Sequence, residues 1–255
     1  MFLTPEEVHQ LSNEFEAMDP PDILAWTVRE FWPQVAISSS FQTQSMPLLH
    51  MAKQARRDIL IFFIDTGYHF WETLIFREQI ASDWKLNVLD LYRDSRWDVF
   101  TRQQVRTLPL EDPQLCCFIH KVQPMQKALK DLKAWITGIR RDQTATRSHA
   151  HILELQEDGL LKINPLLNWT KTEIDAYRQK YELPIHPLLE KGFRSIGCAP
   201  CTAAVGKNED DRAGRWVGRG MTECGLHTEL FQQKDITKVI GRYSLGTSSP
   251  GNIHE

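Results

Sequence analysis

The chain has 255 residues, of which 42% are hydrophobic and 25% are charged, an ordinary balance for a globular protein. Its formal net charge of -3 excludes the strongly basic composition of many nucleic-acid-binding proteins and gives no general attraction to an anionic membrane. Any anion site must therefore come from a local group of Arg and Lys. The sequence has neither a signal-peptide pattern at its start nor an apolar run long enough to span a bilayer. We expect a cytoplasmic protein with no nucleic-acid or membrane partner.

The first part of the chain predicts two helices. A capping box that starts at Thr4 indicates a helix that runs towards Glu16. A second helix follows Asp19 and ends before Pro33, because the residue before a proline is disfavoured in helical backbone. We assign residues 1–33 to these N-terminal helices.

The middle of the chain alternates between two kinds of segment. Short apolar, β-branched runs predict strands at 34–38, 58–64, 86–91, 134–139 and 160–163. Helical periodicity predicts helices at 46–55, 70–84, 122–132 and 170–181. Strands that are apolar on both faces indicate an α/β, Rossmann-like fold, with a mostly parallel sheet covered by helices. In such sheets ligands bind beyond the carboxyl ends of the strands.

The segment 191–230 departs from this alternation, because it is rich in Gly, Cys and Arg and shows little periodicity. It is too long for an idle connection, so we interpret it as the irregular, functional end of a single domain spanning residues 1–230. Residues 231–255 include a Gly-, Ser- and Pro-rich stretch and predict a flexible tail.

Two predicted strand ends carry residues that suit a nucleotide. Ser38–Ser45 leads from a strand into a helix, where free backbone N–H groups and hydroxyls can bind phosphate. Asp65–Gly67 follows the strongest strand, and a carboxylate with a glycine there suits ribose or adenine. Taken alone, an ordinary capped turn explains each segment equally well. The candidate residues are Ser39, Ser40, Phe41, Gln42, Asp65, Thr66 and Gly67.

Two groups of arginines predict an oxyanion site, because the rigid fork of guanidinium donors matches phosphate and sulfate. The first group follows a predicted strand, and the second lies in segment 191–230, where no helical pattern explains it as a solvated face. A member of the first group could instead pair with Asp142 or Glu154. The candidates are Arg140, Arg141, Arg147, Arg212 and Arg215.

Four of the five cysteines form two close pairs. Cys198 and Cys201 have the spacing of two ligands of one metal site. Cys116 and Cys117 are adjacent, and a helix end or bend could direct both thiolates to the same site. Four thiolates suit either structural Zn²⁺ or an iron–sulfur cluster. The alternatives are small buried hydrophobic residues for the first pair and a redox dithiol for the second.

The fifth cysteine, Cys224, has the setting of a reactive thiol. His227 follows three residues later and arginines precede it, and such cations favour the thiolate form. A buried structural cysteine is the alternative, although the polar, glycine-flanked sequence is unusual for one. We therefore predict that Cys224 is a nucleophile.

Together these residues resemble the assimilatory sulfonucleotide reductases, which act on adenylyl sulfate (APS) or 3′-phosphoadenylyl sulfate (PAPS). The resemblance extends from about Ser38 to His227, and the combination of two cysteine pairs with a late Glu-Cys-Gly-Leu-His is highly specific. The motifs that carry it are Ser39-Ser40-Phe41, Asp65-Thr66-Gly67, Cys116-Cys117 with Lys121, Gly138-Ile139-Arg140-Arg141-Asp142-Gln143 with Arg147, Ile196-Gly197-Cys198-Ala199-Pro200-Cys201, Arg212 with Gly214-Arg215-Trp216, and Glu223-Cys224-Gly225-Leu226-His227.

The resemblance implies an adenine nucleotide α-hydrolase-like fold and a [4Fe-4S] cluster on Cys116, Cys117, Cys198 and Cys201. It also implies that the Cys224 thiolate attacks the sulfuryl sulfur and expels AMP, leaving an S-sulfonate from which thioredoxin or glutaredoxin releases sulfite. The groups expected to stabilise the anion are Lys121, Arg140, Arg141, Arg147, Arg212, Arg215 and His227. A homo-oligomer is left open.

The loop Gln42–Ser45 departs from the family pattern. Iron–sulfur members that prefer APS often have Gly-Ala-Glu-Asp here, so the loop leaves PAPS or dual use open, whereas the cysteines favour APS. The competing hypotheses are an ATP-dependent adenylating or thiolating enzyme and a non-catalytic zinc or cluster protein. The first usually has a Ser-Gly-Gly-x-Asp-Ser loop, absent here, and the second leaves Cys224, His227 and the arginines unexplained.

Overall fold

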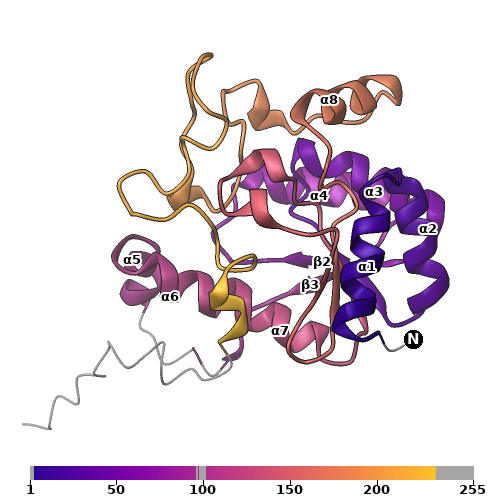
Figure 1. Cartoon of the computed structure of the whole chain (residues 1–255). Coiled ribbons are helices and arrows are strands. Elements are labelled where there is room, and N and C mark those ends of the chain that lie inside the picture. Colours follow the sequence, from indigo (N-terminus) through magenta and orange to yellow (C-terminus); the bar gives the residue numbers. More distant parts are fainter. Residues whose placement is uncertain (1–2, 96, 98–101, 234–255) are drawn as a thin grey trace, which may run out of the picture.

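The computed structural model describes residues 3–95, 97 and 102–233. A six-stranded sheet with the order β3-β2-β1-β4-β6-β5 forms its centre (Figure 1). The strands are β1 (Val35–Ser38), β2 (Leu60–Ile64), β3 (Asn87–Leu91), β4 (Ala134–Ile136), β5 (Leu153–Leu155) and β6 (Leu161–Ile163). All neighbouring pairs are parallel except β5 and β6. The prediction of a mostly parallel α/β sheet is therefore confirmed.

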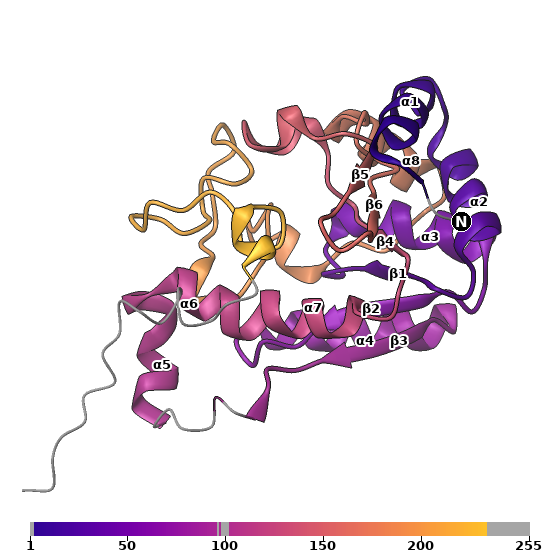
Figure 2. The same ribbon diagram turned by 60° about the horizontal axis from the view of Figure 1, so that its bottom comes forward.

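Helices cover both faces of this sheet. The helices are α1 (Pro5–Phe15), α2 (Pro20–Phe31), α3 (Met46–Ala55), α4 (Trp71–Trp84), α5 (Arg102–Glu111), α6 (Pro113–Cys117), α7 (Gln123–Leu129) and α8 (Lys171–Lys180). Side chains of α1 to α4 and of α8 join one large core, whereas α7 covers the opposite face of the sheet (Figure 2). The predicted capping box at Thr4 is present, and Thr170 forms a second one at the start of α8.

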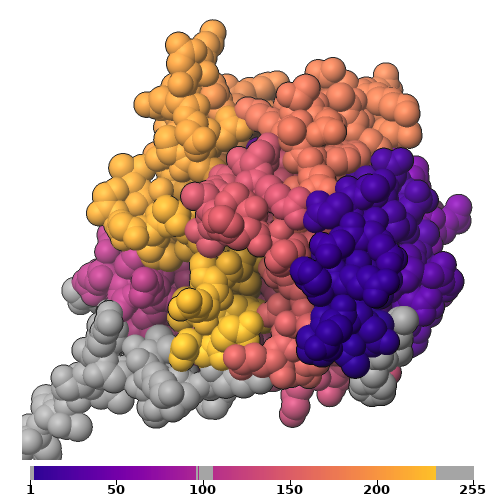
Figure 3. Space-filling view, viewed as in Figure 1, coloured from indigo at the N-terminus to yellow at the C-terminus, as the bar shows by residue number. Residues whose placement is uncertain are grey.

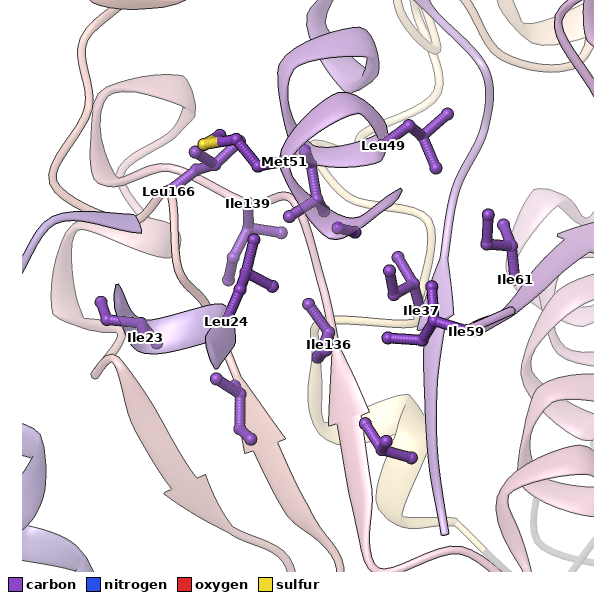
Figure 4. Close-up of a cluster of buried hydrophobic side chains, with 14 of the residues drawn as sticks. Ile23, Leu24, Ile37, Leu49, Met51, Ile59, Ile61, Ile136, Ile139 and Leu166 are labelled. Atoms are coloured by element: carbon purple, nitrogen blue, oxygen red, sulfur yellow. The ribbon is translucent and has the colours of Figure 1, made fainter. Parts of the chain in front are cut away.

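The main core lies between the sheet and helices α1 to α4. Ile37, Ile61 and Ile136 project from adjacent strands towards Leu49 and Met51 of α3 (Figure 4). On the other face a smaller core joins side chains of β1, β2 and β4 to α7. Burial on both faces explains why these strands read as continuous apolar runs rather than as alternating patterns.

Three elements were not predicted. The short strand β5 has Glu154 at its centre, paired with Lys162 of β6 at 2.8 Å, so it forms no apolar run. The helices α5 and α6 contain or begin with proline, at Pro109 and Pro113, which broke the expected periodicity. After α6 the chain widens into a π-helical turn at Phe118–Val122.

Most of the predicted flexible tail, residues 234–255, lies outside the described residues. The described part is bound to the domain, since Gln126 of α7 donates hydrogen bonds to the carbonyls of Phe231 (2.6 Å) and Gln233 (3.2 Å). No helix among the described residues is long and apolar enough to cross a membrane.

The sheet topology fixes where a ligand can bind. The chain adds β2 and β3 on one side of β1 and then places β4 on the other side. From β1 the chain continues to β2 and β3 at one edge of the sheet, and from β4 it continues to β5 and β6 at the other edge. Ligands of open parallel sheets bind at the point where the strand order reverses in this way. The irregular segment after residue 191 extends beyond this end of the sheet (Figure 1).

Candidate active site

A cleft with a volume of about 570 Å³ lies at the carboxyl ends of β1 and β4. Its walls come from Ser38–Ser40, from Thr137–Arg140 and from parts of segment 194–227. This volume is in the usual range for a site that holds a small molecule or nucleotide. The cleft therefore joins the predicted phosphate loop to the irregular Cys- and Arg-rich segment.

The loop after β1 offers hydroxyl groups to the cleft. Ser39, Ser40 and Gln42 line it, as predicted, but Phe41 does not. Phe41 is fully buried with a φ of 52°, and its N–H donates to the Ser39 hydroxyl oxygen at 3.1 Å. The Phe41 ring thus anchors the loop in the core, which leaves the neighbouring serines facing the ligand space.

The turn Asp65–Gly67 lies outside the cleft lining. The Asp65 carboxylate accepts a hydrogen bond from the N–H of Gly67 at 3.0 Å, which is the ordinary capped turn weighed as the alternative. The Thr66 hydroxyl is buried, 3.4 Å from the sulfur of Cys198. Thr66 is therefore a neighbour of the cysteines.

The adjacent residues Arg140 and Arg141 point to different places. Arg140 lines the cleft, but its guanidinium is paired with Asp142 at 2.9 Å, the partner that the sequence suggested. Arg141 is outside the lining and instead binds Glu16, at the end of α1, at 2.6 Å. Arg141 therefore connects the N-terminal helix to the sheet and does not reach the cleft.

Lys121 supplies a cation without an ion-pair partner among the described residues. It projects from the π-helical turn into the cleft. Burial acts to lower the pKa of Lys121, but its interactions with the sulfur groups of Cys198, Cys117 and Cys224 raise this pKa overall. The ammonium group therefore remains charged and available to an anion.

Arg215 is a second cleft cation with no acidic partner among the described residues. Its guanidinium lies over the Trp216 ring at 4.2 Å and donates to the Ser195 hydroxyl at 3.4 Å and the Ile196 carbonyl at 3.3 Å. Its Nε is buried and has no hydrogen-bond partner in the described structure. A buried donor without an acceptor is costly, so Arg215 is suited to an anionic ligand.

Gly197 permits this placement of Arg215. A Cβ atom at position 197 would lie 2.6 Å from the guanidinium carbon of Arg215, closer than carbon atoms can approach. A larger residue at position 197 would therefore force the Arg215 guanidinium to shift.

Cys224 and His227 both line the cleft, with Cys224 only partly buried. The His227 ring stacks on Trp135 of β4, with 5.8 Å between centroids and 13° between planes. Burial holds the pKa of His227 well below its usual value, and Arg147, Lys162 and Arg212 lower it further. His227 is therefore neutral and can donate one N–H to a ligand.

Arg147 and Arg212 share an acidic partner, Glu223, which is part of the Glu223–His227 motif but was given no role in the sequence analysis. The Glu223 carboxylate lies 2.7 Å from Arg147 and 3.4 Å from Arg212. Burial lowers the pKa of Arg212 to about 10, so this guanidinium stays charged at neutral pH. The signal available in the sequence was only the position of Glu223, next to Cys224.

Further cleft residues were also missed. Lys171, at the start of α8, pairs with Asp211 at 2.6 Å, and Arg194 lies 3.6 Å from the same residue. These contacts hold the acidic stretch 209–211 at the cleft wall. The acidic run 209–211 is visible in the sequence, but the two cations that pair with Asp211 lie 17 or more residues away.

Tyr68 contacts the surroundings of both cysteine pairs. Cys198 and Cys201 are buried with Trp216, and Cys116 belongs to a neighbouring cluster; Tyr68 packs against both. Burial, and then the charges of Cys117, Cys198 and Cys201, raise the pKa of the Cys116 thiol. Packing on Tyr68 therefore brings Cys116 and the pair Cys198 and Cys201 to the same part of the fold.

The donor set fits an iron–sulfur cluster chemically, since it consists of sulfur alone. The Cys201 sulfur accepts a hydrogen bond from Arg219 at 3.2 Å, and Thr66 lies beside the Cys198 sulfur. Such hydrogen bonds are typical of sulfur ligands in cluster sites. Within the described residues no group of three or more His, Cys, Asp or Glu side chains is placed for one metal ion.

Comparison with known proteins identifies the fold and the family. The sequence model of the phosphoadenosine phosphosulfate reductase domain family matches residues 34–204. The chain belongs to this family. This reductase-family chain is 35% identical over 229 residues to an adenosine 5′-phosphosulfate reductase of Streptomyces coelicolor, covering 88% of the chain and 96% of the relative. It is 36% identical over 224 residues to one of Bacillus cereus, with 87% and 96% covered.

Solved structures agree with this assignment. A phosphoadenylyl-sulfate reductase from Candida auris, a phosphate complex, superposes with a TM-score of 0.67 and 26% identity, covering 80% of this chain and 99% of that one. An FMN adenylyltransferase from Candida glabrata in complex with ATP has a TM-score of 0.54 and 17% identity, with 82% and 70% covered, and shares the fold alone. The adenine nucleotide α-hydrolase-like fold implied by the sequence resemblance is thereby confirmed.

Proposed function

We propose that this chain reduces APS to sulfite and AMP, with Cys224 as the nucleophile. The observation that carries the proposal is that the partly exposed Cys224 thiol lines the same cleft as Lys121, Arg212 and Arg215. A thiol beside fixed cations is suited to attack an electrophile that carries several negative oxygens. Two similar proteins that match most of this chain are named adenosine 5′-phosphosulfate reductases, which supports APS as the substrate.

In the first step the Cys224 thiolate forms a bond to the sulfuryl sulfur, and the bond from that sulfur to the bridging phosphate oxygen breaks. AMP leaves with the bonding electrons, and Cys224 keeps an S-sulfonate. Negative charge grows on the departing phosphate, so Lys121 and Arg215 stabilise the transition state more than the bound substrate. Neutral His227 donates a hydrogen bond to the same oxygens.

In the second step a thiolate of thioredoxin or glutaredoxin attacks the Cys224 sulfur and sulfite leaves. The resulting mixed disulfide is resolved by the second thiol of the carrier, which restores the Cys224 thiol and leaves the carrier oxidised. Such carriers supply reducing equivalents in the cytoplasm, where we place this enzyme.

The four remaining cysteines are proposed to hold a [4Fe-4S] cluster, on Cys116, Cys117, Cys198 and Cys201. When bound, the cluster would cross-link α6 to the irregular segment and supply a buried charge next to Lys121. The interaction of Lys121 with two of these residues, Cys117 and Cys198, supports that arrangement.

PAPS is a second candidate substrate, because the loop after β1 contains no carboxylate between Gln42 and Ser45. Gln42 accepts a hydrogen bond from the N–H of Ile196 at 3.0 Å, and Gln44 accepts one from Arg140 at 2.8 Å. Neither amide repels a 3′-phosphate. Measuring kcat/KM for APS and for PAPS on the same preparation decides between them.

The variant Cys224→Ser tests the proposal. It is expected to abolish sulfite formation while leaving nucleotide binding intact, because a hydroxyl is a far weaker nucleophile than a thiolate. Without a reductant, the wild-type enzyme and APS should yield the mass of one SO₃ group on the Cys224 peptide. Retained turnover in the serine variant, or an adduct on another cysteine, would refute the assignment.

A further inference from the structure

Glu223, the residue before the nucleophile, is a buried carboxylate with an unusual number of partners. It is only 5% exposed, and its Oε1 and Oε2 accept hydrogen bonds from Nε and Nη2 of Arg147, both at 2.7 Å. The Thr144 hydroxyl donates to Oε1 at 2.8 Å, and Arg212 approaches Oε2 at 3.4 Å. Two parallel bonds to one guanidinium form the strongest common type of side-chain ion pair.

These contacts leave Arg147 little capacity for a substrate. Its Nε and Nη2 are bound to Glu223, and its Nη1 donates to the side-chain oxygen of Gln143. All three guanidinium nitrogens therefore already donate to the protein. Arg212 is different, because within the described part of the chain only its Nη2 donates hydrogen bonds, to the Thr222 carbonyl and to Glu223.

The ion pair also joins two distant parts of the chain. Thr144 and Arg147 belong to the loop that follows β4, whereas Glu223 lies at the end of the irregular segment. Figure 3 shows that end of the chain, in yellow, lying against the loop after β4. This contact of Glu223 therefore fixes the position of the next residue, Cys224, relative to the sheet.

We infer that Glu223 is a positioning residue that holds Cys224 at the cleft, and that Arg147 serves this carboxylate and not the substrate. The inference rests on the proposed function of Cys224. It explains how the Cys224 thiol is placed before it attacks the substrate. Glu223 also neutralises part of the positive charge of Arg147 and Arg212, which the substrate would otherwise meet. The carboxylate thus weakens the attraction of the cleft for the substrate, but it places the thiol.

Glu223→Gln tests the inference, because the amide keeps the size of the side chain and removes its charge. Cys224 should then be less well placed, and a displacement of about 1 Å can reduce a rate about 100-fold. We expect S-sulfonate formation in a single turnover to slow at least about tenfold, alkylation of Cys224 by iodoacetamide to accelerate, and the Kd for AMP to stay equal or fall. A carboxylate needed only for folding would weaken AMP binding together with the rate.

Two further variants complete the test. Glu223→Gln combined with Arg147→Met removes both buried charges, so the test survives if the single variant fails to fold; it should reproduce the slow rate and the faster alkylation. Glu16→Gln is the matched control, since Glu16 pairs with Arg141 away from the cleft; it should change neither. An unchanged rate of Cys224 alkylation in Glu223→Gln, or a higher Kd for AMP, would overturn the inference. Alkylation and AMP binding need no turnover, so these results stay separate from any failure of the proposed reaction.

Discussion

Arg219 shows how a single side chain stabilises the Cys198–Cys201 loop. It donates to the Cys201 sulfur at 3.2 Å, to the Pro200 carbonyl at 2.6 Å and to the Pro109 carbonyl of α5 at 2.9 Å. The Pro109 carbonyl is free to accept because residue 113, its ordinary helical partner, is itself a proline without an N–H. Arg219 therefore fixes the loop against the helix that leads to Cys116.

Cys198→Ser tests whether the cysteines act as cluster ligands. A serine oxygen is a poor ligand for a cluster that is held by thiolates, so the variant should lose both iron and the broad visible absorbance of the purified protein. Cys224→Ser is the matched control and should keep both, because Cys224 lies outside the ligand set. Iron content and colour that are unchanged in Cys198→Ser would remove Cys198 from the site.

The residue types indicated a site rich in cations, but they did not indicate the ion-pair partner of each arginine. Arg140, Arg141 and Arg147 lie within eight positions, yet they pair with Asp142, Glu16 and Glu223 respectively. Only the first partner is local in sequence. The other two lie 125 and 76 residues away, so no local pattern could show which arginine faces the cleft.

Secondary-structure elements were predicted where burial produced a clear sequence pattern. Strands β1, β2, β4 and β6 are covered on both faces and appeared as apolar runs. The sequence indicated that the irregular segment is functional, but it could not predict the structure of this segment. That structure depends on contacts with other elements. Gln42 from the β1 loop, for example, binds the N–H of Ile196 across 154 residues.

Gly197→Ala tests how that irregular segment shapes the cleft. The added Cβ would occupy the space of the Arg215 guanidinium, so this group must shift from its place in the cleft. One hydrogen bond from a charged donor contributes about 1.5–3 kcal/mol, so kcat/KM for the sulfonucleotide should fall about 10- to 100-fold. Gly206→Ala is the control, because its Cβ would meet only a flexible Glu209 side chain at 3.4 Å. An unchanged kcat/KM in Gly197→Ala would mean that Arg215 contacts neither the substrate nor the transition state.

The whole molecule assembles the cleft from segments that are far apart in sequence. The loops after β1 and β4, the π-helical turn and the irregular segment each contribute a wall. The end of the described chain closes this arrangement, because Phe231 stacks near Trp135 at 5.0 Å and its carbonyl accepts a hydrogen bond from Gln126. Loss of the overall fold therefore removes the site completely, which makes global stability a condition for activity.

Buried histidines should make that stability depend on pH. Burial lowers the pKa of His120 to about 4 and that of His186 to about 4, and holds the pKa of His227 well below its usual value. The unfolded chain, where histidine titrates near 6.5, therefore binds these protons more readily than the folded chain. It follows that the free energy of unfolding is largest above pH 6.5 and falls as the pH decreases towards 4.

His186→Gln isolates one of these groups. His186 is fully buried between the Thr73 hydroxyl and the backbone N–H of Leu188, at 3.1 and 3.2 Å, and it lies away from the cleft. A shift from about 6.5 to about 4 corresponds to a loss of roughly 2 kcal/mol between pH 7 and pH 5. Urea unfolding at the two pH values should show that the variant, although less stable at pH 7, loses about that much less than the wild type on acidification. If the free energy of unfolding decreased equally in both proteins, the pKa of His186 in the folded protein would be the same as in the unfolded chain.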